Sequence, residues 1–325
     1  MKSVLRTIAV LAIALLSRPG NAQNDPFEFV ALGDMPYNLP GDYEKFDRLI
    51  DRINTLNPAF SIHVGDIVSG ITRCSDENFT KVKIQFDRFA GALVYTPGDN
   101  DWTDCHRLLM GSYDPLERLA HIRRLFFPET GKSLGRMPLT LENQSRVMPG
   151  EFSPYIENTR FRFKNVLFAS AHVVGSLNNY DPARPAAVAE FEARDKANIV
   201  WIDEAFRLAG QSSALGLVLF WQAHVHATPR RTPDAPFAAP FHNTINAIER
   251  GAAKFNRPVL VIYGDFHFFE VQPFMNLKRE PIPNVRRLQV YGDKFVHAAR
   301  VRIEPANPAL FAIEPLIIPE NGPDK

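Results

Sequence analysis

Three Gly-Asp pairs each follow a short apolar run, an arrangement typical of polar ligands held at the ends of strands. Gly33-Asp34 follows FEFVAL, Gly65-Asp66 follows FSIHV, and Gly98-Asp99 follows ALVYTP. One such pair is uninformative, because glycine and aspartate are common in turns. A glycine turn after a strand, however, holds a side chain rigidly and lets the backbone approach an ion. The repeated pattern therefore indicates a polar site.

Two further polar groups follow later apolar runs. His224 and His226 come after LGLVLFWQA, and Asp265 and His267 come directly after PVLVIYG. Carboxylates and imidazoles at successive strand ends are what a two-metal hydrolytic site requires. His226 points away from His224 if the strand continues, and reaches the same site only if the chain turns.

The first half of the chain alternates predicted strands with predicted helices. The runs FEFVALGD, FSIHVGD and ALVYTPGD indicate buried strands, and helices are predicted over residues 42–56, 75–89 and 115–127. This βαβ order predicts a parallel sheet with right-handed crossovers. In open α/β sheets, sites lie beyond the carboxyl ends of the strands, where all three Gly-Asp pairs fall.

The second half of the chain predicts a second sheet that faces the first. Further strands are expected in FRFKNVLFASAHVVGS, LGLVLFWQAH and PVLVIYGDFH, with helices over residues 185–208 and 243–255. The C-terminal runs LQVYGD, VHAARVRIEP and LFAIEPLIIP are expected to be antiparallel. We found no linker, charge block or repeat, so we expect one domain over residues 23–325.

An insertion is expected near residues 102–160 of this domain. Residues 128–160 are rich in glycine and proline and are predicted to be irregular. Such a segment is either a lid over the site or an ordinary surface excursion.

The N-terminus is typical of a secretory signal peptide. Lys2 and Arg6 precede the apolar stretch 8–16, and Gly20-Asn21-Ala22 provides a small-residue cleavage site. The stretch is shorter than the roughly 20 residues that a spanning helix needs. We expect cleavage after Ala22 and export to the periplasm or the extracellular space. The alternative is an uncleaved anchor or a disordered tail.

The charge balance argues against two classes of partner. The full chain has 37 basic and 36 acidic residues, and loss of Lys2, Arg6 and Arg18 leaves a formal charge of −2. Without a run of basic residues, neither a nucleic-acid surface nor a polybasic membrane patch is expected. The expected partner is a small phosphorylated molecule, as the motifs below imply, and the oligomeric state is left open.

The chain has two cysteines, Cys74 and Cys105. In an exported protein a lone pair most simply forms a disulfide, which here would join the loop after Asp66 to the loop after Asp99. Two free thiols are the alternative. Two cysteines cannot form a zinc-thiolate cluster, so oxygen and nitrogen atoms would hold any metal.

The ordered motifs resemble those of the calcineurin-like metallophosphoesterase superfamily over roughly residues 28–270. That family shows Asp-x-His, Gly-Asp, Gly-Asn-His-Asp/Glu, a lone His after a strand, and Gly-His-x-His. The counterparts here are Asp34-Met35-Pro36, Gly65-Asp66, Gly98-Asp99-Asn100-Asp101, His224, and Gly264-Asp265-Phe266-His267. The resemblance implies a four-layer αββα sandwich in which two mixed sheets face each other and the site lies at the C-terminal ends of strands.

The resemblance also implies two metal ions. Asp66 corresponds to the bridging carboxylate, and Asp34 and His267 would complete the first ion's shell. His224, Asp265 and either Asp99 or Asn100 would serve the second ion. Such mixed shells suit manganese, iron or zinc.

Three departures from the family pattern affect the chemistry. Pro36 stands where the family often has a metal-binding His, a place that Tyr37 or water could fill. Asp265 replaces another His. Without gaps, Asp99 matches the metal-binding Asn and Asn100 the acid-base His, whereas a one-residue shift makes Asn100 the ligand. An amide cannot donate a titratable proton, so His106, His172 or water would serve as the acid.

These features predict an exported metallophosphoesterase that cleaves phosphate mono- or diesters with a metal-bridging hydroxide as the nucleophile. The alternative is a catalytically weak, metal-binding protein on the same fold. An unrelated α/β hydrolase is disfavoured, because the chain lacks a G-x-S-x-G motif.

Overall fold

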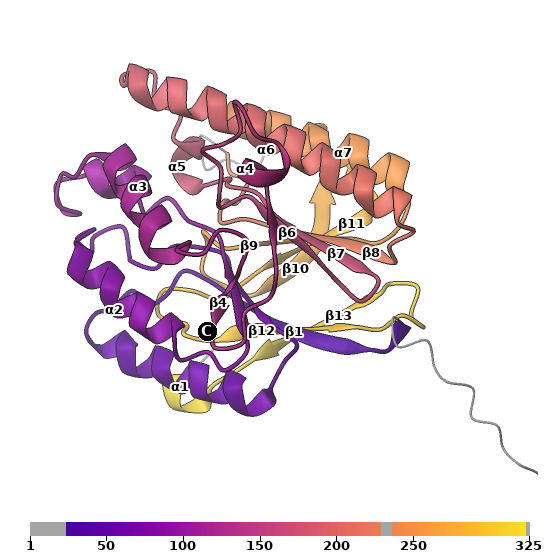
Figure 1. The fold of residues 1–325 in the computed structure, drawn as a ribbon, viewed down its shortest axis with the longest axis horizontal. Coiled ribbons are helices and arrows are strands. Elements are labelled where there is room, and N and C mark those ends of the chain that lie inside the picture. The colour runs from indigo at the N-terminus through magenta and orange to yellow at the C-terminus, as the bar shows by residue number, and fades with distance from the viewer. Residues whose placement is uncertain (1–23, 229–235, 323–325) are drawn as a thin grey trace, which may run out of the picture.

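Two mixed β-sheets lie face to face, with helices on both outer faces, so the chain forms four layers (Figure 1). The structure is a computed structural model that describes residues 24–228 and 236–322. The predicted signal peptide, residues 1–22, lies outside the described residues.

In the described chain, the first sheet has six strands in the order β13-β12-β1-β2-β3-β4. Strands β1, β2 and β3 are mutually parallel, as the βαβ pattern predicts. The strands are β1 (Phe27–Leu32), β2 (Ser61–His63), β3 (Ala92–Tyr95), β4 (Leu134–Gly135), β12 (Ala298–Ile303) and β13 (Phe311–Leu316). The helices on this side are α1 (Gly41–Leu56), α2 (Asp76–Phe86) and α3 (Pro115–Phe126), with the short helices η2 (Thr103–His106) and η4 (Pro319–Asn321).

The second sheet has seven strands in the described chain, in the order β10-β11-β9-β8-β7-β6-β5. Strands β7, β8, β9 and β11 run parallel. The strands are β5 (Glu142–Asn143), β6 (Thr159–Phe163), β7 (Val166–Ser170), β8 (Gly216–Phe220), β9 (Val259–Tyr263), β10 (Glu270–Met275) and β11 (Pro281–Gln289). The helices are α6 (Pro185–Gln211) and α7 (His242–Phe255), with the short helices α4 (Gln144–Val147), α5 (Gly175–Asn178) and η3 (Ala239–Phe241).

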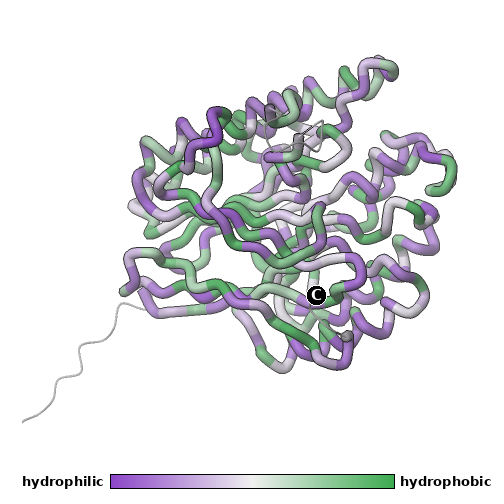
Figure 2. Tube along the Cα trace, turned by 180° about the vertical axis from the view of Figure 1, so that it is seen from behind, coloured by the Kyte–Doolittle hydropathy of each residue, from purple (hydrophilic) through white to green (hydrophobic). Residues whose placement is uncertain are grey.

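Alternating side chains of the strands fill three separate cores. In β1, Val30 and Leu32 pack in the core shared with α1 and α2, whereas Phe29 and Ala31 pack in the core between the two sheets. A third core lies between the second sheet and helices α6 and α7. The helices alternate between hydrophobic and hydrophilic residues along their turns (Figure 2). Each helix therefore buries one face and leaves the other to solvent.

The predicted helices and the predicted four-layer fold are confirmed. Helix α1 begins one residue earlier than predicted and ends at Leu56 as predicted. Ser75 caps α2, because its side chain accepts a hydrogen bond from the Asn78 amide, whereas the helix ends at Phe86. The prediction placed that end at Phe89.

The predicted antiparallel pairing is confirmed for β12 and β13, but the expectation that these strands belong to the second sheet is wrong. Strand β12 joins the first sheet, antiparallel to β1, and β13 extends that sheet further. Because of this pairing β1 is an interior strand and not an edge strand, and Val301 of β12 lies in the core between the sheets. Strand β11 is antiparallel to β10 but parallel to β9.

The segment predicted to be irregular contains two short strands. Strand β4 pairs with the start of β3, where Leu134 lies opposite Leu93. This is the opposite end of β3 from Gly98, so β4 extends the sheet edge instead of covering the Gly-Asp turns. Strand β5 pairs with β6 at the edge of the second sheet.

Within the described residues, no helix combines the length and apolar character needed to cross a bilayer.

Candidate metal centre

The ends of β1, β2, β3 and β9 bring four carboxylates together. Asp34 follows β1, and its amide donates to the Gly65 carbonyl at 2.9 Å, next to Asp66. Its Oδ1 atom accepts a hydrogen bond of 3.0 Å from the Asp265 amide in the facing sheet. The charge of Asp99 acts on Asp34, Asp66 and Asp265. We call Asp34, Asp66, Asp99 and Asp265 the carboxylate cluster.

Asp66 is the most heavily hydrogen-bonded member of the cluster. Its Oδ1 accepts from the Asn100 amide at 3.0 Å. Its Oδ2 accepts from the Tyr37 hydroxyl at 2.9 Å, Gln222 Nε2 at 3.1 Å and Asn100 Nδ2 at 3.1 Å. Gln222 follows β8, so Asp66 connects the two sheets. The sequence analysis missed Gln222, although its place just after a buried strand was a usable signal.

Two of the glycines in the motifs make room for carboxylates from neighbouring loops. A Cβ atom on Gly264 would overlap the Asp34 carboxylate, and one on Gly98 would overlap the Asp66 carboxylate. Glycine is therefore required for the close approach of these loops, as the Gly-Asp pattern indicated.

Four of the predicted ligands adopt left-handed backbone conformations. Their φ angles are 52° for Asp34, 54° for Asp66, 82° for Asp265 and 70° for His267. Residues other than glycine rarely adopt this conformation, and it is concentrated at functional sites, where the surrounding structure imposes it.

The electrostatics of the cluster favour a bound cation. Burial and then the charges of Asp265 and Asp99 raise the pKa of Asp34, and burial followed by the charge of Asp99 raises the pKa of Asp66. The same two causes raise the pKa of Asp265 to about 7. In the described part of the chain, no lysine or arginine pairs with these carboxylates. Cations would relieve both the burial cost and the mutual repulsion.

Two carboxylate oxygens of the cluster have no described hydrogen-bond partner, which is consistent with a metal ligand role. Asp34 Oδ2 and Asp99 Oδ1 are buried without a hydrogen-bond partner. Such atoms are uncommon and call for an explanation such as an ion. Among residues 24–228 and 236–322, however, no three His, Cys, Asp or Glu side chains converge well enough to hold one ion as they stand. The donor set therefore fits metals chemically, and binding would require side chains to rotate.

Asp101 holds two of the strand-end loops together, a role that sequence analysis did not assign. Its Oδ2 accepts from the Gly98 amide at 2.7 Å, the Asp66 amide at 3.1 Å and the Tyr95 hydroxyl at 2.7 Å. Its Oδ1 accepts from the Ile67 amide at 2.8 Å. Asp101 thus fixes the Asp66 turn against the Gly98 turn.

A second polar group lies against Asp99. The Ser176 hydroxyl is 2.7 Å from Asp99 Oδ2 and 2.9 Å from Asp104 Oδ2, and Arg107 Nη2 donates to it at 3.1 Å. Arg107 also pairs with Asp104 at 2.7 Å, and its side chain is 47% exposed. Arg107 is therefore a solvent-facing cation next to the Asp99 turn. No motif in the sequence pointed to Ser176.

His224 and His226 are both engaged by one arginine from β11. Arg287 Nη1 lies 3.1 Å from His224 Nε2 and 3.1 Å from His226 Nδ1. A guanidinium can only donate, so both ring nitrogens accept. The lone pair of His224 Nε2 is thus directed at Arg287, and its buried Nδ1 has no partner. His226 Nε2 donates to the Met275 carbonyl at 2.9 Å.

His267 and Tyr37 both lie at the cluster. His267 Nε2 is 3.7 Å from Asp34 Oδ1, and its ring packs edge-on against Tyr37 at 5.2 Å between centroids. The Tyr37 hydroxyl accepts from Asn100 Nδ2 at 3.2 Å and donates to Asp66. Tyr37 therefore enters the site beside Pro36, which cannot contribute a nitrogen ligand.

The two histidines considered as general acids differ in burial and in their hydrogen-bond partners. His172 is fully buried, with Nδ1 2.8 Å from Glu157 and Nε2 accepting from Trp102 Nε1 at 3.1 Å. Both ring nitrogens therefore already have protein partners, and a role for His172 as the acid stays a prediction. The exposed His106 contacts the Thr103 carbonyl at 2.7 Å and Arg184 at 3.4 Å through Nδ1. Within the described residues, these contacts of the His106 ring are with Thr103 and Arg184 and not with the carboxylate cluster.

The predicted disulfide is present. Cys74 and Cys105 are bonded, and their Cα atoms are 5.7 Å apart. Their sulfur atoms lie 3.5 and 3.6 Å from the Asn100 carbonyl, so the bridge packs directly beneath the Asp99-Asn100 turn.

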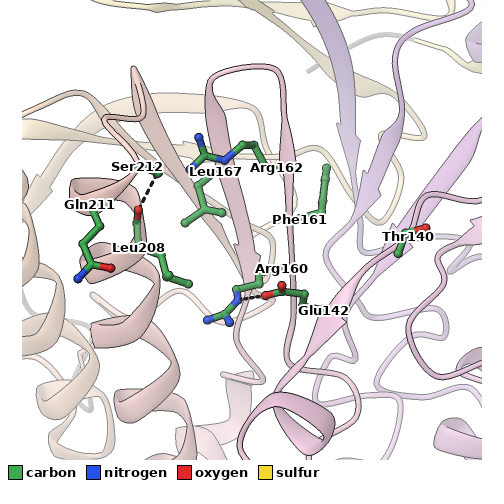
Figure 3. Close-up of a pocket in the computed structure, with 9 residues that line it drawn as sticks. All are labelled: Thr140, Glu142, Arg160, Phe161, Arg162, Leu167, Leu208, Gln211 and Ser212. Carbon is green, nitrogen blue, oxygen red and sulfur yellow. Dashed lines mark hydrogen bonds and ion pairs between the residues drawn. The ribbon is translucent and has the colours of Figure 1, made fainter. Parts of the chain in front are cut away.

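A cavity of about 560 Å³ lies at the start of β7 and the end of α6 (Figure 3). Of its two arginines, Arg160 is paired with Glu142 at 2.7 Å and lies over the Trp201 ring at 4.4 Å. None of the predicted ligands lines this cavity, so it is separate from the candidate metal centre.

Known structures share this fold at low sequence identity. The chain is similar to a dimetal phosphatase from Danio rerio, at 11% identity and a TM-score of 0.53, over 86% of this chain and 96% of that one. It is similar to purple acid phosphatase PPD1 from yellow lupin, at 11% identity and a TM-score of 0.51, over 92% of this chain and 55% of that one. GAP50 of Plasmodium, described as the anchor in the inner membrane complex, aligns at 10% identity and a TM-score of 0.50, over 90% of this chain and 89% of that one.

Scans against protein-family models and curated proteins yield no match. The fold that these structures share with the chain is nevertheless plain: it is an α/β sandwich of two mixed sheets with flanking helices, the calcineurin-like fold.

Proposed function

We propose that this protein is a metal-dependent phosphohydrolase that cleaves phosphate mono- or diesters. The observation that carries the proposal is the buried carboxylate cluster, whose Asp34 Oδ2 and Asp99 Oδ1 atoms have no partner. Its position at the C-terminal ends of parallel strands supports the same conclusion. The phosphatases that share the fold add support at the level of architecture.

Two ions of the manganese, iron or zinc type would share Asp66. Asp34 and His267 would hold one of them, and Asp99 and Asp265 the other, which His224 would also bind once Arg287 released its Nε2 atom. When bound, the ions would activate water and stabilise charge on the phosphoryl oxygens.

The chain's own residues have separate tasks. Asn100 and Gln222 orient Asp66 through their hydrogen bonds, and Ser176 orients Asp99. Arg107 supplies an exposed positive charge that attracts an anionic ester. We propose Asp99 as the ligand of the Asp99-Asn100 turn, because its Oδ1 is buried without a described hydrogen-bond partner, whereas hydrogen bonds to Asp66 and Tyr37 fix the Asn100 side chain.

The test is turnover of p-nitrophenyl phosphate and its bis ester. The protein would be assayed after chelation and after reloading with manganese, iron or zinc, with metal content measured in parallel. We expect turnover only in the reloaded protein, and Asp66→Asn should reduce it about 1000-fold, since it removes a shared ligand. Metal-independent turnover, or Asp66→Asn at full activity, would refute the proposal.

A catalytically weak metal-binding protein is the second candidate. Arg287 engages His224 Nε2, and Asn100 occupies the position of the family's acid-base His. GAP50, described as an anchor, has the same fold. Tight metal binding without turnover of either ester would favour this candidate.

We also propose that the protein is exported to the periplasm or the extracellular space. The sequence of residues 1–22 and the Cys74–Cys105 disulfide support this, because disulfides persist in oxidising compartments. A mature protein that begins at Gln23 in the exported fraction would verify it, and an intact N-terminus in the cytoplasm would contradict it.

A further inference from the structure

A cavity of about 640 Å³ borders the candidate metal centre. Two predicted ligands, Asp265 and His267, line one part of it, and Phe266, Phe268, His226, Ala227 and Thr228 line the rest. Its volume falls in the range of ordinary small-molecule pockets, which is about 300–1,000 Å³. A molecule whose phosphoryl group lies at the metal centre would therefore extend its organic part into this cavity.

The two phenylalanines of the cavity are exceptional in this protein. The chain has 25 phenylalanines, all within the described residues, and only Phe266 and Phe268 are exposed, at 47% and 44%. All the others are buried or partly buried. Exposing two large apolar rings in the lining of one cavity is unfavourable in the free protein, and exposed apolar surface of this kind marks a binding site.

Local contacts hold the Phe266 ring and the Phe268 backbone in place. The Phe266 ring stacks on His224 with centroids 4.3 Å apart and an interplanar angle of 11°. The Phe268 carbonyl accepts a hydrogen bond of 2.9 Å from Gln289 Nε2 in β11. One face of Phe266 is thus covered by His224, and the exposed remainder is available to a flat group. A ring fixed in advance loses little conformational entropy on binding.

The His226 imidazole that lines the cavity already has polar partners. His226 uses both ring nitrogens, one towards Arg287 and the other towards the Met275 carbonyl. Its ring packs edge-on against Phe237 and Phe274, at 4.9 and 4.4 Å between centroids. Phe266, Phe268, Ala227 and this engaged imidazole give much of the lining an apolar character, so an aromatic group would find contacts here without needing polar partners.

We propose that this cavity binds the aromatic group of an aryl phosphate ester, with the ring against Phe266 and Phe268 and the phosphoryl group at Asp265 and His267. The inference rests on the proposed function and names the substrate class of the same site. Offset or edge-to-face contact between rings supplies selectivity that a saturated group of similar size does not gain.

The experiment measures binding of stable phosphonates to the metal-loaded protein by calorimetry. Phenylphosphonate, cyclohexylphosphonate and methylphosphonate share the anionic group and differ only in the organic part. We expect phenylphosphonate to bind about 10-fold more tightly than methylphosphonate and measurably more tightly than cyclohexylphosphonate. Equal affinities for the three, or no binding of any, would overturn the proposal.

Variants locate the effect. Phe268→Ala and Phe266→Ala should each weaken phenylphosphonate binding about fivefold and leave methylphosphonate binding unchanged, while Phe266→Tyr should keep the preference. Ile84→Ala, which removes an exposed apolar side chain from α2, is the matched control and should change neither. Metal content is measured for every variant, because Phe266 touches His224. If Phe266→Ala loses metal, Phe268→Ala decides the outcome.

The two proposals fail in different ways. If esters are hydrolysed but phenyl- and methylphosphonate bind equally, the aryl subsite is wrong and the phosphohydrolase stands. If no ester is hydrolysed but phenylphosphonate binds preferentially and the preference is lost in the phenylalanine variants, the subsite stands and the proposed activity is wrong.

Discussion

The two halves of the candidate site differ in how their side chains are held. The first-sheet half, Asp34, Asp66, Asp99 and Asn100, is cross-linked by hydrogen bonds and still leaves Asp34 Oδ2 and Asp99 Oδ1 free. The second-sheet half, His224, Asp265 and His267, includes a histidine whose accepting nitrogen is engaged by Arg287.

This difference shows that a position at a strand end is not enough to make a side chain a ligand. A carboxylate has several lone pairs and can accept hydrogen bonds while keeping an oxygen for an ion, whereas a neutral imidazole has one lone pair. A single arginine in β11 therefore changes the availability of His224, although it leaves the backbone arrangement of the site unaltered.

The largest expected effect compares one ligand from each half. Asp34→Asn should weaken metal binding about 100-fold or more, because it removes a direct ligand, and replacing even a supporting residue costs about 10–100-fold. His224→Ala should weaken it less than about 10-fold, because its lone pair is already engaged. Competition with a chromogenic chelator would measure both.

Arg287→Gln provides the control for this comparison. It removes the cation that faces His224, so His224→Ala should cost more metal affinity in the Arg287→Gln background than in the wild type. Equal costs for Asp34→Asn and His224→Ala in the wild type would contradict the difference between the halves.

The next effect concerns the disulfide beneath the first-sheet half. Cys74 and Cys105 are 31 residues apart, so loss of the bridge should lower the free energy of unfolding by about 3–4 kcal/mol. Urea unfolding of the wild type, with and without reductant, and of Cys74→Ser with Cys105→Ser would measure it. The double variant should match the reduced wild type. If the oxidised wild type exceeded both by less than about 1 kcal/mol in unfolding free energy, other contacts would hold the turn without the bridge.

The sequence predicted the first-sheet half better than the second for a physical reason. Gly-Asp turns after β1, β2 and β3 are local signals, and parallel strands necessarily bring their ends to one edge. The engagement of His224 by Arg287 joins a residue that follows β8 to one in β11, 63 positions away, and no local pattern encodes it. The antiparallel pairing of β12 with β1 was missed for the same reason, since alternation indicates a strand but not its partner.

A smaller effect is expected for Asp101, the carboxylate that connects the Asp66 and Gly98 turns. Asp101→Asn keeps one accepting oxygen but turns an amide group towards hydrogen-bond donors, so we expect a loss of about 3 kcal/mol in unfolding free energy. Urea unfolding would measure it, with Asp114→Asn as control. Asp114 caps α3, and asparagine caps helices as well as aspartate does, so the control should be nearly neutral. A neutral Asp101→Asn would show that the two turns are held by other contacts.

The smallest effect tests the link between the halves. Glu157 holds His172, which accepts a hydrogen bond from Trp102 beside Asp101, so a buried chain runs from the second sheet to the first-sheet half. Burial raises the pKa of Glu157, but the charge of Arg123 and the hydrogen bond from His172 lower it by more, so the net pKa lies below its usual range. A depressed carboxyl pKa stabilises the fold above the unfolded pKa of about 4.3, and this contribution is lost as pH falls towards the folded pKa.

The wild type should therefore lose about 2 kcal/mol between pH 7 and pH 3 through Glu157 alone, and Glu157→Gln should not show this loss. Urea unfolding of both proteins at the two pH values isolates it, because the other carboxyls contribute equally to each. A constant difference between the two proteins at both pH values would mean that Glu157 is not held as a carboxylate. The chain joining the two halves would then depend on packing instead of charge.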